Sequence, residues 1–274
     1  MTLTSQRLEG RTALVTGAGR GVGKGIALEL ARAGCRVAVN YRSSADLAEG
    51  TVAEIQAMGV DAFAVKADVA ASAEVGDMIS RVVTRFRSLH ILVNNSGVQT
   101  WKPFLHVSEA EWDLVIDTNL KGCFLCTQAA ALHMKDHGGG SIVNIGSGCN
   151  KMPFPNLVAY TASKGGIEML TKVAAVELGQ YGIRVNCVAP GAIEIERTRL
   201  ESADYAGVWG AITPLGRVGT PSDIGQAVVY LASPESSFVS GQTLWVDGGL
   251  FTRSAWPNRG YEPDNETADF GARR

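Results

Sequence analysis

A glycine-rich turn between a predicted strand and a predicted helix constrains the fold of this 274-residue chain most strongly. Residues 12–16 form a short apolar run typical of a buried strand, and apolar residues recur at helical spacing over 26–31. The turn at 16–23 reads T-G-x-x-x-G-x-G instead of the usual G-x-G-x-x-G. Glycines let the backbone approach phosphates, and a helix N-terminus offers free N–H groups. The turn therefore indicates a dinucleotide site, although a purely structural turn has the same composition.

Strand-like and helix-like segments alternate along the rest of the chain. Further strands are predicted at 36–40, 62–66, 91–94, 141–145, 184–188 and 243–246, and further helices at 45–58, 74–86, 109–137, 158–181 and 224–231. This alternation predicts a doubly wound α/β Rossmann fold with a seven-stranded parallel sheet and helices on both faces. No Pro/Ser-rich linker divides residues 1–251, so we expect the cofactor and substrate sites in one domain.

Tyr160 and Lys164 indicate the chemistry. Their spacing places both side chains on one face of the predicted helix. The nearby ammonium favours the phenolate form, so Tyr160 can exchange a proton with a carbonyl or alcohol oxygen. Ser147, which precedes this helix, can hydrogen-bond the same oxygen and position it. Together with a hydride-carrying dinucleotide, the three residues predict interconversion of a ketone and a secondary alcohol.

The ordered motifs resemble those of the short-chain dehydrogenase/reductase family over about residues 8–250. The matching features are residues 16–23, Asp68 and Val69, the Asn-Asn-Ser-Gly of 94–97, Asn119, Ser147, Tyr160, Lys164, Pro190 and Gly191. The resemblance implies that Ser147, Tyr160 and Lys164 are catalytic and that Asn119 belongs to a water relay behind Lys164. It also implies a homo-oligomer, with a tetramer favoured, formed through the helices of Asn119 and Tyr160 and through the last strand.

Two positions depart from the family pattern. Ser96 stands where the family commonly has alanine. Ile195 occupies the place of a threonine that often reaches the nicotinamide amide, a contact that Thr198 can replace.

The cofactor site is predicted from the glycine turn and the strand ends. Asn40 stands where an NAD site has an acidic residue, while Arg20 and Arg42 can clasp a 2′-phosphate. We therefore expect NADP(H) in preference to NAD(H). Resemblance assigns Asp68 and Val69 to the adenine, Asn95 and Gly97 to the ribose–nicotinamide path, and Pro190, Gly191 and Ile193 to the nicotinamide. The full predicted set is Gly17, Arg20, Gly21, Val22, Gly23, Asn40, Tyr41, Arg42, Ser43, Asp68, Val69, Asn95, Gly97, Tyr160, Lys164, Pro190, Gly191 and Ile193.

The substrate pocket is predicted between segments 98–106, 149–156 and 192–218; the last is too long for an ordinary connection between a strand and a helix. These segments supply Trp101, Phe104, Phe154 and Trp209, with the polar Gln99, Asn150, Lys151, Glu194 and Glu196. Such a mixed pocket suits a cyclic ketone, an aryl ketone or a sugar. His106 either binds substrate or is an ordinary surface histidine.

Within the family, sugar dehydrogenases and 3-oxoacyl-carrier-protein reductases are the most similar groups. Enoyl reductases are disfavoured because they space the tyrosine and lysine more widely. No basic cluster marks a docking site for a carrier protein, although Arg197 and Arg199 leave it open. The alternative is a catalytically silent nucleotide-binding regulator or scaffold of the same fold.

The remaining composition excludes several other classes. The net charge is −2 and no basic block indicates nucleic acid. No apolar run reaches the length of about eighteen residues that a membrane span needs, and the polar residues 1–10 predict no secretory signal, so we expect a cytoplasmic protein.

The five cysteines, including Cys123 and Cys126, are interpreted as buried thiols, and the histidines lack metal-ligand spacing, so no metal site is predicted. Residues 252–274 form a polar tail, either solvated or an inter-subunit arm anchored by Trp256 and Tyr261.

Overall fold

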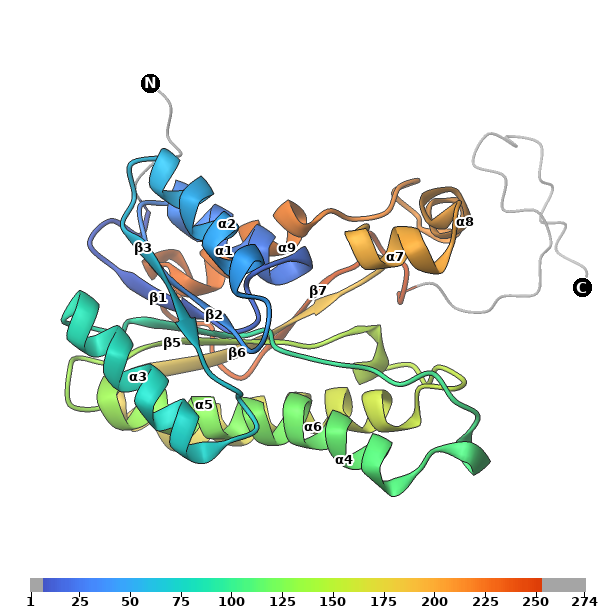
Figure 1. Ribbon diagram of the computed structural model, residues 1–274, viewed down its shortest axis with the longest axis horizontal. Coiled ribbons are helices and arrows are strands. Elements are labelled where there is room, and N and C mark those ends of the chain that lie inside the picture. Colours follow the sequence, from blue (N-terminus) through green and yellow to red (C-terminus); the bar gives the residue numbers. More distant parts are fainter. Residues whose placement is uncertain (1–6, 253–274) are drawn as a thin grey trace, which may run out of the picture.

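A parallel sheet of short, mostly buried strands organises the computed structural model, which describes residues 7–252 (Figure 1). Its strands are β1 (Thr12–Val15), β2 (Arg36–Tyr41), β3 (Ala62–Lys66), β4 (Ile91–Asn94), β5 (Gly140–Ile145), β6 (Ile183–Pro190) and β7 (Thr243–Val246). Their order is β3-β2-β1-β4-β5-β6-β7, and every pair is parallel. This order confirms the predicted doubly wound fold, with the connections diverging between β1 and β4.

Helices cover both faces of the sheet (Figure 1). They are α1 (Gly21–Arg32), α2 (Ala45–Ala57), α3 (Ser72–Phe86), α4 (Glu109–Ile116), α5 (Gly122–Met134), α6 (Val158–Leu178), α7 (Glu196–Glu201), α8 (Tyr205–Ile212) and α9 (Pro221–Ala232). α1, α2 and α9 lie on one face, and α3 to α6 lie on the other. α7 and α8 stand beyond the carboxyl ends of the strands, where they overhang the edge of the sheet.

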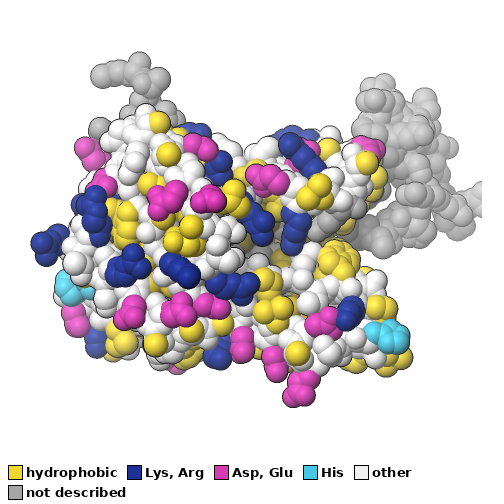
Figure 2. All heavy atoms as spheres, viewed as in Figure 1, with side chains coloured by type: hydrophobic (Ala, Val, Ile, Leu, Met, Phe, Trp, Pro, Cys, Tyr) yellow, Lys and Arg dark blue, Asp and Glu magenta, His cyan; other side chains and the backbone are white. Residues whose placement is uncertain are grey.

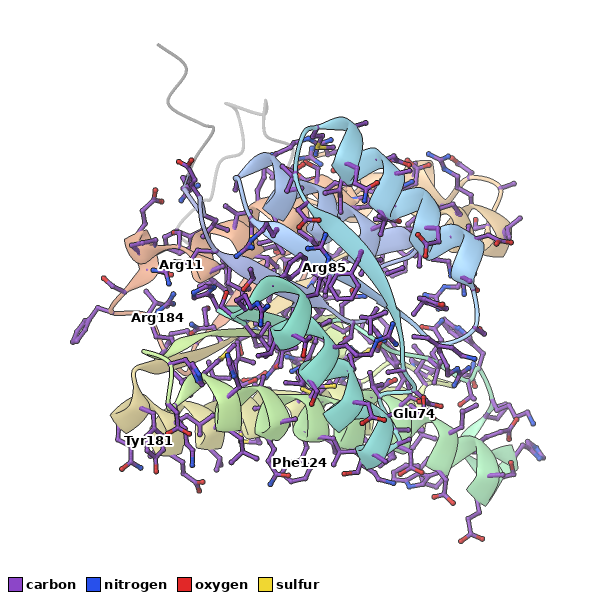
Figure 3. The ribbon with its side chains drawn as sticks, turned by 60° about the vertical axis from the view of Figure 1, so that its left-hand side comes forward. Arg11, Glu74, Arg85, Phe124, Tyr181 and Arg184 are labelled. Atoms are coloured by element: carbon purple, nitrogen blue, oxygen red, sulfur yellow. The ribbon has the colours of Figure 1, made fainter. Side chains whose placement is uncertain are left out.

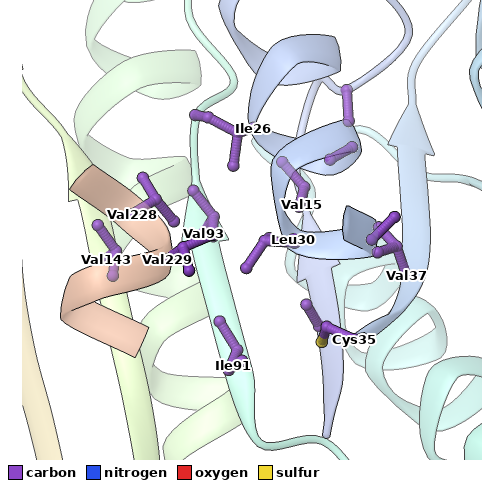
Figure 4. Close-up of a cluster of buried hydrophobic side chains, with 14 of the residues drawn as sticks. Val15, Ile26, Leu30, Cys35, Val37, Ile91, Val93, Val143, Val228 and Val229 are labelled. Carbon is purple, nitrogen blue, oxygen red and sulfur yellow. The ribbon is translucent and has the colours of Figure 1, made fainter. Parts of the chain in front are cut away.

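Each face has its own hydrophobic core, because successive strand residues point to opposite sides. Val15, Ile91 and Val93 pack with Ile26 and other residues of α1 and α9 (Figure 4). Leu14, Leu92 and other alternate residues pack instead against α3 and α5 in the second core. Because both faces of the sheet are buried, the sequences of its strands are nearly continuous apolar runs.

The observed elements follow the predicted ones with three differences. The predicted helix 109–137 is α4 and α5 joined by a π-helical turn, Asp117–Lys121. α9 begins at Pro221, ahead of the predicted start, because Thr220 and Asp223 form a capping box. The segment 192–218, expected as a long loop, contains α7 and α8. Asp223, the acidic residue of the α9 capping box, accepts two hydrogen bonds from Arg217. This guanidinium holds the pKa of the Asp223 carboxyl well below its usual range.

The carboxyl ends of the strands meet at one edge, which is where doubly wound folds bind ligands. The glycine turn follows β1, and the Asn-Asn-Ser-Gly motif follows β4, so the two motifs are neighbours in the sheet. The predicted tail, apart from Thr252, lies outside the described residues. Within 7–252, no helix combines the length and apolar character needed to cross a bilayer.

Candidate active site

The glycine turn adopts a backbone that favours glycine. Gly17 and Gly21 have φ values of +62° and +55°, in the left-handed region. A Cβ on Gly23 would lie 2.5 Å from the carbonyl oxygen of Gly17, so α1 packs too closely for a side chain there. Arg20 precedes α1 without a side-chain cap, which leaves the first N–H groups of the helix facing the turn. The turn fits a dinucleotide pyrophosphate, because it is tight, is rich in glycine and carries uncapped donors.

Two asparagines brace this turn from opposite sides. The Gly17 N–H donates to Asn40 Oδ1 at 3.1 Å, while Asn95 Nδ2 donates to the carbonyl oxygens of Thr16 and Gly17 at 2.9 and 3.2 Å. Asn40 is only 1% exposed, and its Nδ2 donates to the carbonyl oxygens of strand β3 and the residue after it, Val65 and Ala67. Asn40 therefore braces the turn, and its predicted contact with the cofactor stays a prediction.

The predicted ribose-phosphate residues gather at the ends of β2 and β3. Arg20, Arg42 and Ser43 are exposed, and Tyr41 is half-buried. The guanidinium of Arg42 lies 3.9 Å from a carboxylate oxygen of Asp68. Val69 is buried against Gly122, where a Cβ would come 2.8 Å from the valine side chain. Arg20 lies in the glycine turn, while Arg42, Ser43, Asp68 and Val69 follow the strands on the β2 side of β1, and their contact with the adenosine stays a prediction.

Tyr160 and Lys164 lie one turn apart on α6. The ammonium of Lys164 is 5.4 Å from the centre of the Tyr160 ring and donates to the carbonyl oxygen of Ile145 at 2.7 Å. Lys164 is only 4% exposed. The shared helix face expected from their spacing is confirmed, and the end of β5 fixes the ammonium beneath the phenol.

Ser147 follows β5 and begins a short 3-10 turn, Gly148–Asn150. Its Oγ accepts a hydrogen bond from the Cys149 N–H at 3.2 Å, and its own N–H donates to Asn150 Oδ1 at 3.0 Å. Asn150 Nδ2 donates in turn to the Cys187 sulfur. The serine is thus held by its neighbours, and its hydroxyl hydrogen remains available to a substrate oxygen.

Asn119 lies in the π-helical turn and is 1% exposed. Its Oδ1 accepts from the Val98 N–H at 2.8 Å, and its Nδ2 donates to the Val98 carbonyl oxygen and to Ser163 Oγ. Ser163 Oγ donates to the backbone oxygen of Tyr160. Both amide hydrogens of Asn119 are therefore used to join the segment after β4 to α6, and the predicted water relay stays a prediction.

One cavity of about 510 Å³ joins the catalytic residues to the substrate region. It is lined by Gln99, Trp101, Ser147, Gly148, Cys149, Phe154, Leu157, Tyr160, Pro190, Gly191, Ala192, Arg197, Thr198, Ser202, Tyr205, Trp209 and Phe251. Four of the nine predicted pocket residues are among them, namely Gln99, Trp101, Phe154 and Trp209. The prediction was wrong for Phe104, which is 74% exposed, and for Asn150, Lys151, Glu194 and Glu196, because none of the five lines the cavity. His106 is exposed and also lies outside the lining.

Thr198 lines the cavity, but its hydroxyl serves the backbone. Its Oγ1 accepts from the Ile195 N–H at 2.9 Å and donates to the Ile195 carbonyl oxygen at 2.9 Å, which caps α7. Ile195 lies over the glycine turn, since a Cβ on Gly21 would be 3.5 Å from its Cδ1. The residue that replaces the family threonine therefore contacts the turn through carbon atoms. Pro190 ends β6 and lines the cavity, and Ile193 is buried.

The cysteines contribute to packing in the interior. All five are free and buried. Burial raises the pKa of Cys123 to about 12 and that of Cys187 to about 11, so both thiols stay protonated at neutral pH. In the part of the chain that the structure describes, no group of three His, Cys, Asp or Glu side chains is arranged to hold a metal.

Comparisons with known proteins agree on the family. A family model described as enoyl-(acyl carrier protein) reductase matches residues 17–251. The 3-oxoacyl-[acyl-carrier-protein] reductase FabG of Staphylococcus epidermidis is 45% identical over 241 residues, which cover 88% of this chain and 99% of the relative. The hydroxynaphthalene reductase-like protein Arp2 of Metarhizium brunneum is 39% identical over 263 residues, covering 91% of this chain and 98% of the relative.

Solved structures agree with the sequence relatives. A gluconate 5-dehydrogenase from Burkholderia cenocepacia, in complex with NADP and tartrate, superposes with a TM-score of 0.85 at 38% identity. A putative short-chain alcohol dehydrogenase from Sinorhizobium meliloti gives a TM-score of 0.86 at 38% identity. Each match covers 90% of this chain and 98% of the other. The fold, the glycine turn, the tyrosine–lysine pair and these similarities together show that the chain belongs to the short-chain dehydrogenase/reductase family, as an oxidoreductase that acts on CH–OH groups.

Proposed function

We propose that this protein is an NADP(H)-dependent enzyme that interconverts a ketone and a secondary alcohol, with Tyr160 as the proton donor and acceptor. The observation that carries the proposal is the shared cavity, into which Ser147 and Tyr160 both face beside Pro190 and Gly191. Lys164 lies directly beneath the phenol ring. This arrangement brings a proton source to the edge of the sheet where the glycine turn would hold a dinucleotide.

Each residue has a separate task in ketone reduction. NADPH, when bound, supplies a hydride to the carbonyl carbon. The Tyr160 hydroxyl donates its proton to the carbonyl oxygen, which becomes the alcohol. Ser147 donates a hydrogen bond to the same oxygen and holds it against the phenol. Lys164, whose ammonium is fixed by Ile145, stabilises the phenolate that remains after proton transfer.

The preference for NADP(H) rests on charge at the end of β2. Position 40 is occupied by a buried asparagine, so no carboxylate is present there to repel a 2′-phosphate. Arg20 in the turn and Arg42 just after β2 are exposed, and guanidinium groups can bind a phosphate through several donors. The NADP complex of the gluconate 5-dehydrogenase relative supports the same cofactor.

Arg42 provides the test of this preference. Arg42→Ala removes a charge-assisted contact with the 2′-phosphate, so kcat/KM for NADPH should fall about 10- to 100-fold while kcat/KM for NADH changes little. Initial rates with each cofactor measure the effect. Arg81→Ala, an exposed arginine on α3, is the matched control. Equal losses with both cofactors, or a lower KM for NADH than for NADPH in the parent, would contradict the preference.

The reaction direction and substrate class differ among the relatives. Their names indicate a 3-oxoacyl thioester, a hydroxynaphthalene and gluconate as substrates. The family model carries the name of an enoyl reductase, but ketone reduction is favoured because Tyr160 and Lys164 are separated by one helical turn. A catalytically silent regulator is less favoured, since Ser147, Tyr160 and Lys164 keep the geometry that proton transfer needs.

We also propose a homo-oligomer built on the outer helical layer. Phe124 and Leu132 are exposed on α5, and Met169, Val173 and Val176 form an exposed apolar stripe on α6. Figure 3 shows Phe124 on the outer side of this layer. Apolar stripes of this kind on neighbouring helices are typical of a subunit interface. A cytoplasmic location stays a prediction.

The activity test is the oxidation of NADPH and NADH with a 3-oxoacyl thioester, an aryl ketone and a keto sugar acid, followed by absorbance. We expect turnover with NADPH on at least one ketone. Tight NADPH binding without turnover on any ketone would favour the silent regulator.

A further inference from the structure

Phe251 forms a wall of the substrate cavity that the catalytic motifs do not include. It lies just beyond β7, yet its ring covers Gly148, the residue next to Ser147. A Cβ on Gly148 would come 2.8 Å from Phe251 Cε1, so the ring occupies the place of a side chain at position 148. Phe251 therefore shapes the part of the cavity directly beside the serine that would hold the carbonyl oxygen.

Several contacts fix the Phe251 ring and backbone in this position. The Phe251 N–H donates to Asp247 Oδ2 at 2.9 Å, and its carbonyl oxygen accepts from Lys151 Nζ at 3.2 Å. The ring packs edge to face against Phe154, with centroids 5.9 Å apart and planes at 89°, and against Trp245 at 6.3 Å. Two aromatic rings pack against the Phe251 ring, and hydrogen bonds hold its backbone N–H and carbonyl oxygen. Phe251 therefore presents a rigid surface to the substrate.

Aromatic side chains also form the other walls. Trp101 comes from the segment after β4, while Tyr205 and Trp209 come from α8, with ring centroids 6.1 Å apart. Figure 2 shows hydrophobic side chains gathered at the hollow between the α7–α8 overhang and the body of the molecule. The lining also contains polar side chains, among them Gln99, Arg197 and Ser202, beside Ser147 and Tyr160. Rigid aromatic walls bind flat rings through edge-to-face and offset contacts, which a flexible chain does not provide.

Lys102 and Arg199, in two of the segments that contribute to the cavity, are paired within the protein, and Arg197 lines the cavity itself. Arg199 donates to Glu194 at 3.0 Å, and Lys102 lies 2.5 Å from Glu111. Pairing with these acids reduces the positive potential that would attract an acidic carrier protein. These two ion pairs therefore favour a free small molecule over a chain bound to an acidic carrier protein.

We propose that the substrate is a ring-containing ketone, with the carbonyl in or beside a planar ring, and that Phe251 determines this specificity. The inference rests on the proposed ketone reduction and names its substrate class. The ring of the substrate lies against Phe251 and Phe154 while its oxygen meets Ser147 and Tyr160. A linear 3-oxoacyl chain makes no comparable contact and loses more conformational freedom on binding.

The test compares 1-tetralone, a bicyclic aryl ketone, with acetoacetyl-coenzyme A, a linear 3-oxoacyl thioester. We expect the parent enzyme to have the higher kcat/KM for 1-tetralone. Phe251→Leu should lower kcat/KM for 1-tetralone about tenfold and leave the value for the linear substrate within a few-fold, because only ring contacts are lost. Phe154→Leu is a second variant with the same expected pattern. Phe104→Leu, at a 74% exposed residue outside the cavity lining, is the matched control.

A binding measurement separates this inference from the proposed function. The affinity of 1-tetralone for the NADP-loaded protein is measured by quenching of tryptophan fluorescence in the parent and in Phe251→Leu. Absence of turnover on every ketone would refute the proposed function, while binding that weakens in Phe251→Leu would still support a ring-binding site. A preference for acetoacetyl-coenzyme A, equal losses on both substrates in Phe251→Leu, or no binding of 1-tetralone would overturn the inference.

Discussion

Asn40 lies where the sequence predicts it, near the end of β2, and its side chain has a structural role there. Its position at the end of β2 is the place where an acid would bind the ribose, and the structure has it there. Burial and backbone hydrogen bonds direct its amide inward to Gly17, Val65 and Ala67. Sequence reasoning identifies the missing acid, but the direction of the side chain depends on the neighbouring strand.

Asn40→Leu should destabilise the protein and weaken cofactor binding together. The Gly17 N–H and two carbonyl oxygens lose a buried partner, which should lower the free energy of unfolding by about 1–3 kcal/mol. The glycine turn loses one brace, so the Kd for NADPH should rise. Denaturant unfolding and a fluorescence titration with NADPH measure the two effects. An unchanged Kd in a folded Asn40→Leu protein would show that the brace does not support the turn.

At the scale of elements, the strands were predicted most accurately. The predicted bounds of β3, β4 and β7 match the observed ones, because short apolar runs between turn residues have few alternatives. α7 and α8 were missed, since neither has a repeating apolar face long enough to detect. They depend on local caps, such as Asp204, whose side chain accepts from the Gly207 N–H, and on their position over the cavity.

The candidate site likewise contains residues that the sequence predicts and one that it does not. The spacing of Ser147, Tyr160 and Lys164 predicts that they lie together, because one helix and the preceding strand fix their geometry, and their catalytic roles stay a prediction. Phe251 was missed, since a turn after β7 and a hydrogen bond to Asp247 bring it back to the cavity. Only the three-dimensional path of that turn makes it part of the site.

Close packing of α1 against α9 gives a prediction for these two helices. A Cβ on Gly25 would lie 2.8 Å from the backbone carbonyl carbon of Pro221, so Gly25→Ala should force the helices apart and cost about 1–3 kcal/mol of unfolding free energy. Gly76, on α3, has no atom within 4 Å of such a Cβ. Gly76→Ala should therefore stabilise the protein by about 0.5–1 kcal/mol. Chemical denaturation of the two variants tests this contrast, and equal effects would contradict the packing argument.

At the scale of the whole molecule, the exposed stripe on α6 predicts assembly. Val176 is 82% exposed, and Met169 and Val173 lie on the same face. Light scattering of the parent should give the mass of an oligomer, with a tetramer expected. Val176→Glu places a charge in the proposed interface and should lower that mass, whereas Gln180→Glu, in the turn just beyond α6, serves as a control for added charge. A monomeric parent would contradict the assembly.

Tyr160→Phe tests the central claim most directly, because it removes one hydroxyl and keeps the ring over Lys164. If Tyr160 donates the proton, kcat for ketone reduction should fall by roughly 10²–10⁴-fold while the Kd for NADPH stays close to that of the parent. Tyr181→Phe, at a 44% exposed tyrosine just beyond the same helix, should change neither quantity. A Tyr160→Phe enzyme that reduces its ketone at the parent rate would contradict the account.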